Sequence, residues 1–129
     1  MAVRMRLTAI TLDCADPMAL AAFYRDATGL PLDPRSTEEF AGLRAEDGFF
    51  IGFQRVEGYR PPTWPGQDTP QQLHADFDVD DLDEAEAAVL ALGATKPAHQ
   101  SGGDRWRVFL DPAGHPFCLT LRKNPTPRA

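Results

Sequence analysis

Three polar side chains on one short segment are the first candidates for chemistry. Residues 72–79 alternate between polar and apolar types, as a half-buried strand does, and the alternation places His74, Asp76 and Asp78 on one face. An imidazole beside a carboxylate can act as a general base, can contact a ligand, or can simply hydrogen-bond within a cleft wall. His74 is therefore the candidate catalytic residue, and the neighbouring aspartates are candidates to tune it or to line a solvated surface.

This segment lies in the second of two similar halves of the chain. Each half begins with a short alternating strand that runs into an aspartate able to cap a helix. The matching landmarks are separated by 64 to 66 residues and are the pairs Asp16 and Asp81, Gly29 and Gly93, and Gly48 and Gly114. Three landmarks at nearly one offset predict an internal duplication.

The same patterns predict the elements that position the polar face. Helices are expected after Asp16-Pro17 and after Asp81, each ending at a glycine. Strands are expected at 6–13, 30–36, 38–46, 49–56, 72–79, 95–99, 104–110 and 116–122. We therefore predict an α+β protein that forms a single domain over 1–129. Its parts are a βαβββ module at about 6–56, a proline-rich connector at about 57–71, a second module at about 72–122 and a frayed tail at 123–129.

Composition narrows the classes of partner. A net charge of −6 argues against nucleic acid and against anionic membrane surfaces, because both require a basic protein surface. No apolar run approaches the ~20 residues of a membrane-spanning helix, and the first residues do not read as a signal peptide. The two cysteines are too few for a disulfide scaffold. We expect a cytoplasmic protein with reduced thiols.

Two motifs connect the pattern to a known family. They are AAFYRDATGL at 21–30 and RVFLDPAGHPFC at 107–118. Together with the paired βαβββ modules, they resemble the vicinal oxygen chelate superfamily, which includes glyoxalase I, fosfomycin- and bleomycin-resistance proteins, extradiol dioxygenases and methylmalonyl-CoA epimerase. The resemblance spans about 6–122 and implies a curved mixed sheet around a cleft, with the helices on the outer face. It also implies a homodimer.

The resemblance further implies where a metal ion would bind. Metal-binding members take one ligand from the first strand and one from the last strand of each module, and these four places read Ala9, Gly52, His74 and Cys118. Alanine and glycine have no ligating side chain, and two ligands alone bind a metal ion weakly. We therefore expect no metal and no other cofactor. A divalent metal held by His74 with other groups is the alternative.

The cleft that the resemblance implies identifies further ligand contacts. Gln54 should face it with an amide that both donates and accepts. Trp106 and Phe109 point to opposite faces of one strand, so that at least one should face the cleft, unless both serve only for packing. Cys118 is either a small buried side chain or a thiol activated by an electropositive neighbourhood. The expected ligand contacts are His74, Gln54, Trp106, Phe109, Cys118 and Asp76.

Three functions are consistent with these residues. The first is a metal-independent protein that binds a small, partly aromatic or amphipathic molecule in the inter-module cleft, as the resistance proteins of the superfamily do. The second is a lyase or isomerase that uses His74 as metal ligand or general base. The third is an interaction subunit whose surface matters more than its cleft.

Overall fold

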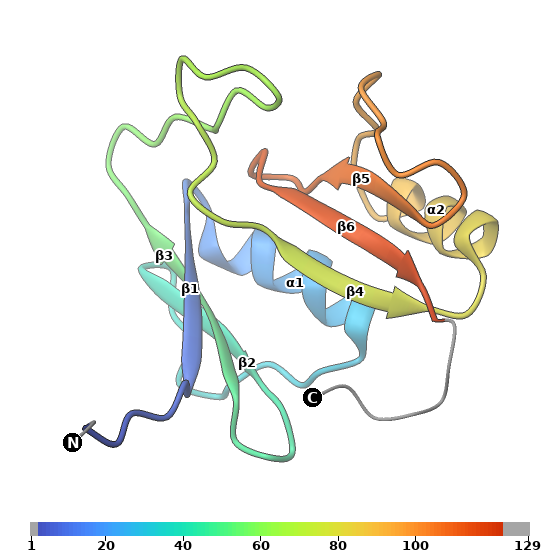
Figure 1. Cartoon of the computed structure of the whole chain (residues 1–129). Coiled ribbons are helices and arrows are strands. Elements are labelled where there is room, and N and C mark those ends of the chain that lie inside the picture. Colours follow the sequence, from blue (N-terminus) through green and yellow to red (C-terminus); the bar gives the residue numbers. More distant parts are fainter. Residues whose placement is uncertain (1–2, 123–129) are drawn as a thin grey trace. The chain divides into compact units, whose positions relative to one another are not determined.

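A strand, a helix and two further strands follow one another twice in the computed structural model, which describes residues 3–122 (Figure 1). The first set comprises β1 (Ala9–Cys14), α1 (Pro17–Thr28), β2 (Phe40–Arg44) and β3 (Phe50–Arg55). The second comprises β4 (Ala75–Val79), α2 (Leu82–Ala91), β5 (Trp106–Leu110) and β6 (Pro116–Leu121). The strands expected at 30–36 and 95–99 are each reduced to one bridge, at Leu32 and at Thr95. The predicted α+β class and the repeated order of elements are confirmed.

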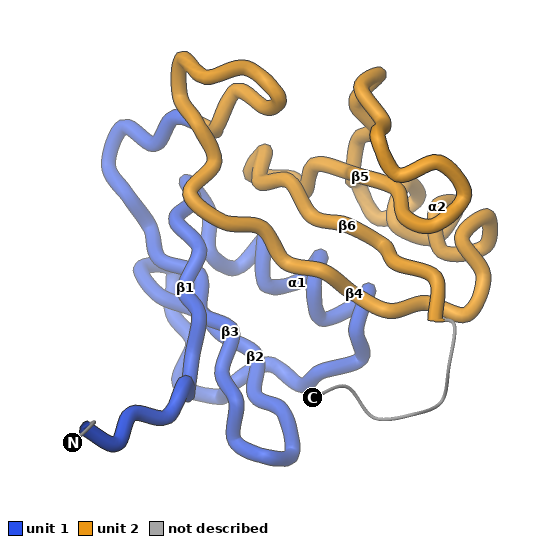
Figure 2. Tube along the Cα trace, viewed as in Figure 1, with its two compact units in different colours: residues 1–60 blue, residues 61–129 orange. Residues whose placement is uncertain are grey.

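The chain separates into two compact units, residues 1–60 (unit 1) and residues 61–129 (unit 2), as Figure 2 shows. The boundary falls inside the predicted connector, which forms neither helix nor strand. Within the described residues, no helix is both long enough and apolar enough to cross a membrane. The tail predicted at 123–129 lies outside the described residues, and the single domain and the inter-module cleft stay predictions.

Local capping explains where the helices begin. The carboxylate of Asp16 accepts a hydrogen bond from the backbone N–H of Ala19 at 3.1 Å, and Asp81 accepts one from Glu84 at 3.0 Å. These bonds satisfy backbone donors that have no partner within the first turn of a helix. α1 ends at Gly29, whose φ of 79° is left-handed and favours glycine. The predicted helix starts are therefore confirmed, together with their physical cause.

Each unit has one sheet, and the two sheets share one topology. The strand order is β1-β3-β2 in unit 1 and β4-β6-β5 in unit 2, with the first pair parallel and the second antiparallel in both. In the parallel pairs, Thr11 lies opposite Gly52 and Asp76 lies opposite Cys118. The equivalent registers show that the duplication seen in the sequence extends to strand pairing.

In unit 1, α1 covers one face of the sheet and leaves the other face open. Leu20, Phe23 and Tyr24 of the helix are buried, as are Leu43 and Phe53 of the strands beneath it. Alternation along each strand sends the neighbouring side chains to the opposite face. This burial shows that the apolar face of α1 packs against the sheet.

In unit 2, α2 packs against the sheet, and Leu82 and Val89 of the helix and Phe117 of β6 are buried. Two leucines next to these elements are exposed instead, since Leu73 precedes the first residue of β4 and Leu92 follows the last turn of α2. His74 and Asp76 share one face, as the alternation predicts, and both are exposed on the open side of the sheet.

Candidate functional site

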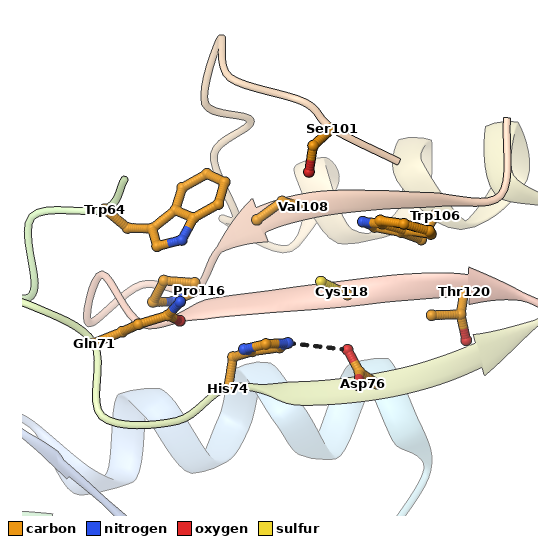
Figure 3. Close-up of a pocket in the computed structure, with 10 residues that line it drawn as sticks. All are labelled: Trp64, Gln71, His74, Asp76, Ser101, Trp106, Val108, Pro116, Cys118 and Thr120. Carbon is orange, nitrogen blue, oxygen red and sulfur yellow. Dashed lines mark ion pairs between the residues drawn. The ribbon is translucent and has the colours of Figure 1, made fainter. Parts of the chain in front are cut away.

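The open face of the unit 2 sheet has a hollow of about 370 Å³, shown in Figure 3. Its walls come from the connector, from the start of β4, from the loop before β5, and from β5 and β6. The lining residues are Trp64, Gln71, His74, Asp76, Ser101, Trp106, Val108, Pro116, Cys118 and Thr120. Four of the six predicted ligand contacts, His74, Asp76, Trp106 and Cys118, are thus brought together in one unit.

A nitrogen, an oxygen and a sulfur meet on one side of this hollow. Nε2 of His74 lies 3.4 Å from Oδ1 of Asp76, the ion pair drawn in Figure 3. Parallel pairing places Asp76 opposite Cys118, so that one potential ligand atom from each of the three side chains lies within 4.8 Å of the others. Zinc accepts all three donor types, and the cluster therefore fits a three-ligand zinc site. Ala9 and Gly52 of unit 1 add no ligating side chain.

The thiol of Cys118 is held in its protonated form. Burial raises the pKa of Cys118 to about 11, and the negative charge of Asp76 together with its hydrogen bond acts in the same direction. A thiolate is the reactive form of cysteine, and no group in this cluster stabilises it in the absence of a metal. The structure thus supports the interpretation of Cys118 as a small buried side chain and not as a nucleophile.

Alkylation of Cys118 by iodoacetamide should be slow near neutral pH and should rise steeply with pH. The rate is expected to increase by about tenfold per pH unit until the pH approaches the raised pKa, because only the thiolate reacts. Mass spectrometry of the peptide that contains Cys118 measures this rate. Asp76→Asn removes one cause of the raised pKa and should shift the profile to lower pH. A rate that levels off at or below about pH 8 would show that the pKa of the thiol is not raised and would contradict the assignment.

The aromatic wall of the hollow comes from Trp106, which resolves the choice that alternation left open. Phe109 is 0% exposed and packs against Phe117, with 5.9 Å between ring centroids. Its side chain therefore points into the core of unit 2 and does not line the hollow, and its contact with a ligand stays a prediction. Trp106 lies on the open face, half-buried, with the guanidinium of Arg105 5.2 Å from its ring centroid.

Gly102 determines where the Trp106 ring lies. A β-carbon at this buried position would come within 2.6 Å of the indole and would also overlap the backbone oxygen of Trp106. The absence of a side chain allows the loop before β5 to approach the strand closely. Gly102 therefore positions the aromatic wall without touching a ligand itself.

The connector contributes two residues to the hollow. Trp64 is half-buried at one end of it, and its ring also contacts His99, with 5.5 Å between centroids (Figure 3). The loop that carries Trp64 closes on itself, because Thr63 and Thr69 exchange hydrogen bonds. Within the described residues, the buried Oε1 of Gln71 has no hydrogen-bond partner. A buried acceptor of this kind is expected to be satisfied by a ligand or by water.

Sequence reasoning missed Gln71 because nothing local marks it. The residue lies in a proline-rich stretch just before the first predicted strand of module two, and neither periodicity nor a motif singles it out. Gln54, by contrast, was expected to contact a ligand but lies in unit 1. It is exposed on the same face of β3 as Phe50 and Gly52, and it is not among the residues lining the hollow. Its contact with a ligand stays a prediction.

Removing the imidazole of His74 should leave the stability of the protein nearly unchanged. The side chain is 41% exposed, and its ion pair with Asp76 is open to solvent, so that His74→Ala is expected to change the free energy of unfolding by less than ~1 kcal/mol. Urea unfolding measures the change. Phe109→Ala, on the buried face of β5, is the control and should cost about 3–5 kcal/mol. A loss for His74→Ala as large as that for the control would show that His74 is a core residue.

Comparison with known proteins agrees with the fold. A family described as a glyoxalase-like domain matches residues 9–120. Similar solved structures include a glyoxalase/bleomycin resistance protein/dioxygenase family enzyme from Burkholderia phytofirmans, 23% identical over 91% of this chain and 98% of that chain, with a TM-score of 0.68. A glyoxalase/dioxygenase from Nostoc punctiforme is 19% identical over 92% of each chain, with a TM-score of 0.67.

A genomically encoded fosfomycin resistance protein from Listeria monocytogenes is also similar. It is 18% identical over 94% of each chain, with a TM-score of 0.68. The sequence matches none of the curated proteins with which it was compared. Identities this low establish a shared fold, and the function has to be inferred from the residues of the site.

Proposed function

The chain belongs to the glyoxalase-like domain family, within the vicinal oxygen chelate superfamily. From this premise we propose that it binds a small, partly aromatic molecule without a metal ion. The ligand would occupy the hollow of unit 2 and would carry a hydrogen-bond donor. The observation that carries the proposal is the unpartnered Oε1 of Gln71, a residue of the hollow that two indole rings also line.

The aromatic part of the ligand follows from the walls. Trp64 and Trp106 offer π-surfaces against which a planar group packs favourably. A volume of about 370 Å³ lies at the lower end of the size range typical of small-molecule sites. The hollow therefore suits a ligand of one or two rings.

The polar part of the ligand follows from the acceptors. Gln71 presents a carbonyl oxygen. Asp76 presents a carboxylate, and Nε2 of His74 lies 3.4 Å from only one of its oxygens, Oδ1. Both groups accept hydrogen bonds, and one is negative, so that an amine or ammonium group on the ligand would satisfy them. An aromatic or amphipathic amine is the ligand class that this combination favours.

Two features favour binding without a metal. The places in unit 1 that would complete the family's ligand set are Ala9 and Gly52, neither of which can ligate through a side chain. The remaining thiol would have to lose a proton whose pKa is raised to about 11 before it could bind a metal ion. Binding of a small molecule without a chemical step requires no such ion.

One observation favours a second candidate function, a small-molecule lyase or isomerase. The donors of His74, Asp76 and Cys118 lie within 4.8 Å of one another and would hold a zinc ion. When bound, zinc would polarise a substrate oxygen as a Lewis acid. Without zinc, Asp76 would orient the imidazole of His74, which would then accept a proton from a substrate carbon or oxygen.

Two measurements test the proposal against this alternative. Elemental mass spectrometry of protein purified without chelator, followed by titration with zinc and cobalt, measures metal binding. Thermal unfolding with a panel of aromatic amines, and with neutral rings of the same size, measures ligand binding. The proposal expects sub-stoichiometric metal and stabilisation by the amines. Tightly bound zinc whose cobalt form shows a thiolate charge-transfer band would overturn it and favour the lyase.

Point variants locate the binding. Trp106→Leu should weaken binding of the best amine by about fivefold, because an aromatic–aromatic contact of this kind is worth on the order of 1 kcal/mol. Leu90→Ala, at an exposed position of α2, is the control and should leave binding unchanged. Equal losses in both variants would place the amine elsewhere.

A further inference from the structure

We propose that unit 1 carries a second ligand site, independent of the function proposed above, and that this site takes a planar aromatic carboxylate. The site is a hollow of about 380 Å³ beside β2, and two phenyl rings and two guanidinium groups are among the groups that line it. Its residues lie between Asp33 and Phe50. Neither the family's metal positions nor the predicted ligand contacts include them.

The aromatic side of the hollow consists of Phe40 and Phe50 on neighbouring strands. Their rings are parallel within 3°, with 6.0 Å between centroids. The tip of the Phe50 ring occupies the space that a β-carbon of Gly42 would fill, and the tip of the Phe40 ring would lie 2.8 Å from a β-carbon of Gly52. Glycine at both positions therefore allows the two rings to lie over the strands.

This aromatic surface is open to a ligand. Phe40 is 39% exposed, and Phe50 is partly exposed. Exposing large aromatic side chains side by side leaves apolar area in water, which a bound planar ring would remove. A ring on this surface would also find the edges and faces of two phenyl groups within reach.

The charged side of the hollow has more positive than negative charge. The buried carboxylate of Asp33 accepts hydrogen bonds from Nε and Nη2 of Arg35, at 3.1 and 3.0 Å, and from Nη2 of Arg44 at 3.2 Å. One carboxylate thus faces two guanidinium groups, and one positive charge remains uncompensated within the hollow. Among the residues that line the hollow, these two guanidinium groups are the ones that would attract an anion.

The arginines are also held in place for a ligand. Arg44 donates to the carbonyl of Gly48 at 3.2 Å and lies 4.8 Å from the centroid of the Phe50 ring. Arg35 is 79% exposed, and among the described residues none accepts a hydrogen bond from its Nη1. The guanidinium of Arg35 holds the pKa of Asp33 well below its usual range, so that the carboxylate keeps both arginines oriented at neutral pH. A ligand carboxylate would accept from Arg35 while its ring lies on Phe40 and Phe50.

The two hollows should therefore select ligands of opposite charge. The hollow of unit 2 presents the acceptors of Gln71 and Asp76, whereas the hollow of unit 1 presents the donors of Arg35 and Arg44. An aromatic amine and an aromatic carboxylate distinguish the two sites in one protein. Failure of either site leaves the other unaffected.

The test is a titration of the full chain, isotope-labelled for NMR, with naphthoate. The expected result is saturable movement of the backbone amide signals of residues 33–50. Acetate has the charge without the ring and naphthylmethanol has the ring without the charge. Each should bind at least about fivefold more weakly than naphthoate, because each lacks one of the two contacts.

Substitutions assign the contacts. Arg35→Gln leaves Arg44 as the partner of the buried Asp33 carboxylate, so that the protein should still fold, and is expected to weaken naphthoate binding by about fivefold. Added salt should weaken binding to the unsubstituted protein. Arg25→Gln removes the same charge from the same unit, where Arg25 pairs with Asp26 on α1, and should leave binding unchanged. Phe40→Leu keeps the apolar character but removes the ring, and it should also weaken binding.

Three results would overturn the proposal. The first is the absence of saturable movement at residues 33–50. The second is equal weakening by Arg35→Gln and Arg25→Gln, which would show attraction to total charge only. The third is movement centred on residues 101–120, which would place naphthoate in the hollow of unit 2.

Discussion

Replacing Phe23 by alanine is expected to lower the free energy of unfolding by about 3–5 kcal/mol. Phe23 is 4% exposed and lies edge-to-face against Tyr24, with 4.9 Å between ring centroids. Tyr24 stacks in turn on Phe53 at 5.7 Å, so that the cavity would open within the cluster that joins α1 to its sheet. Neighbouring rings held by strands cannot collapse fully into such a space, and both the lost burial and the cavity contribute to the cost.

Urea unfolding followed by circular dichroism measures this loss. Met18→Ala is the control on the same helix, since Met18 is 37% exposed and its truncation should cost less than ~1 kcal/mol. A near-zero change for Phe23→Ala would mean that the helix does not use this face for packing. The burial pattern on which the unit 1 fold rests would then be wrong.

Introducing a single methyl group at Gly102 should both destabilise unit 2 and displace a wall of its hollow. Gly102→Ala places a β-carbon against the backbone oxygen of Trp106 and 2.6 Å from its ring, and a backbone atom cannot move aside as a flexible side chain can. Overpacking of this kind typically costs about 1–3 kcal/mol. The loop before β5 should also shift and carry the indole of Trp106 away from the hollow.

Two readouts separate these consequences. Denaturant unfolding gives the change in stability, and indole fluorescence together with aromatic-amine binding reports the position of Trp106. Asp104→Ala is the matched control, because Asp104 is an exposed residue of the same loop outside the lining of the hollow, and its β-carbon is already present. If Gly102→Ala left stability, fluorescence and binding unchanged, the close approach of the loop to β5 would be refuted.

Local physics made much of the fold predictable. A capping carboxylate acts within three residues, and a glycine with positive φ acts at one residue, so that Asp16, Asp81 and Gly29 mark helix ends in the sequence itself. Alternation along a strand is likewise local, and it placed His74 and Asp76 together on the open side of β4. The connector was recognisable because prolines exclude it from helix and strand.

The candidate site was only partly predictable, for a physical reason. Alternation states that Trp106 and Phe109 face opposite ways but not which face is covered, and that depends on Phe117 and α2. The role of Gln71 depends on side chains from β6 and the connector that surround it. The pairing of Asp33 with Arg44 joins residues eleven positions apart across a loop and a strand, and no periodicity signals it.

Four properties were predictable from the residues alone. They are the family, the duplicated order of elements, the helix ends, and the lack of ligating side chains at Ala9 and Gly52. These properties depend on residue identity and on interactions over a few neighbouring residues. Only the tertiary structure decided that His74, Asp76 and Cys118 converge, that Phe109 is buried, and that an arginine-rich aromatic hollow lies on unit 1. Those properties depend on cross-strand register and on which face a helix covers, and both arise from contacts between residues distant in the chain.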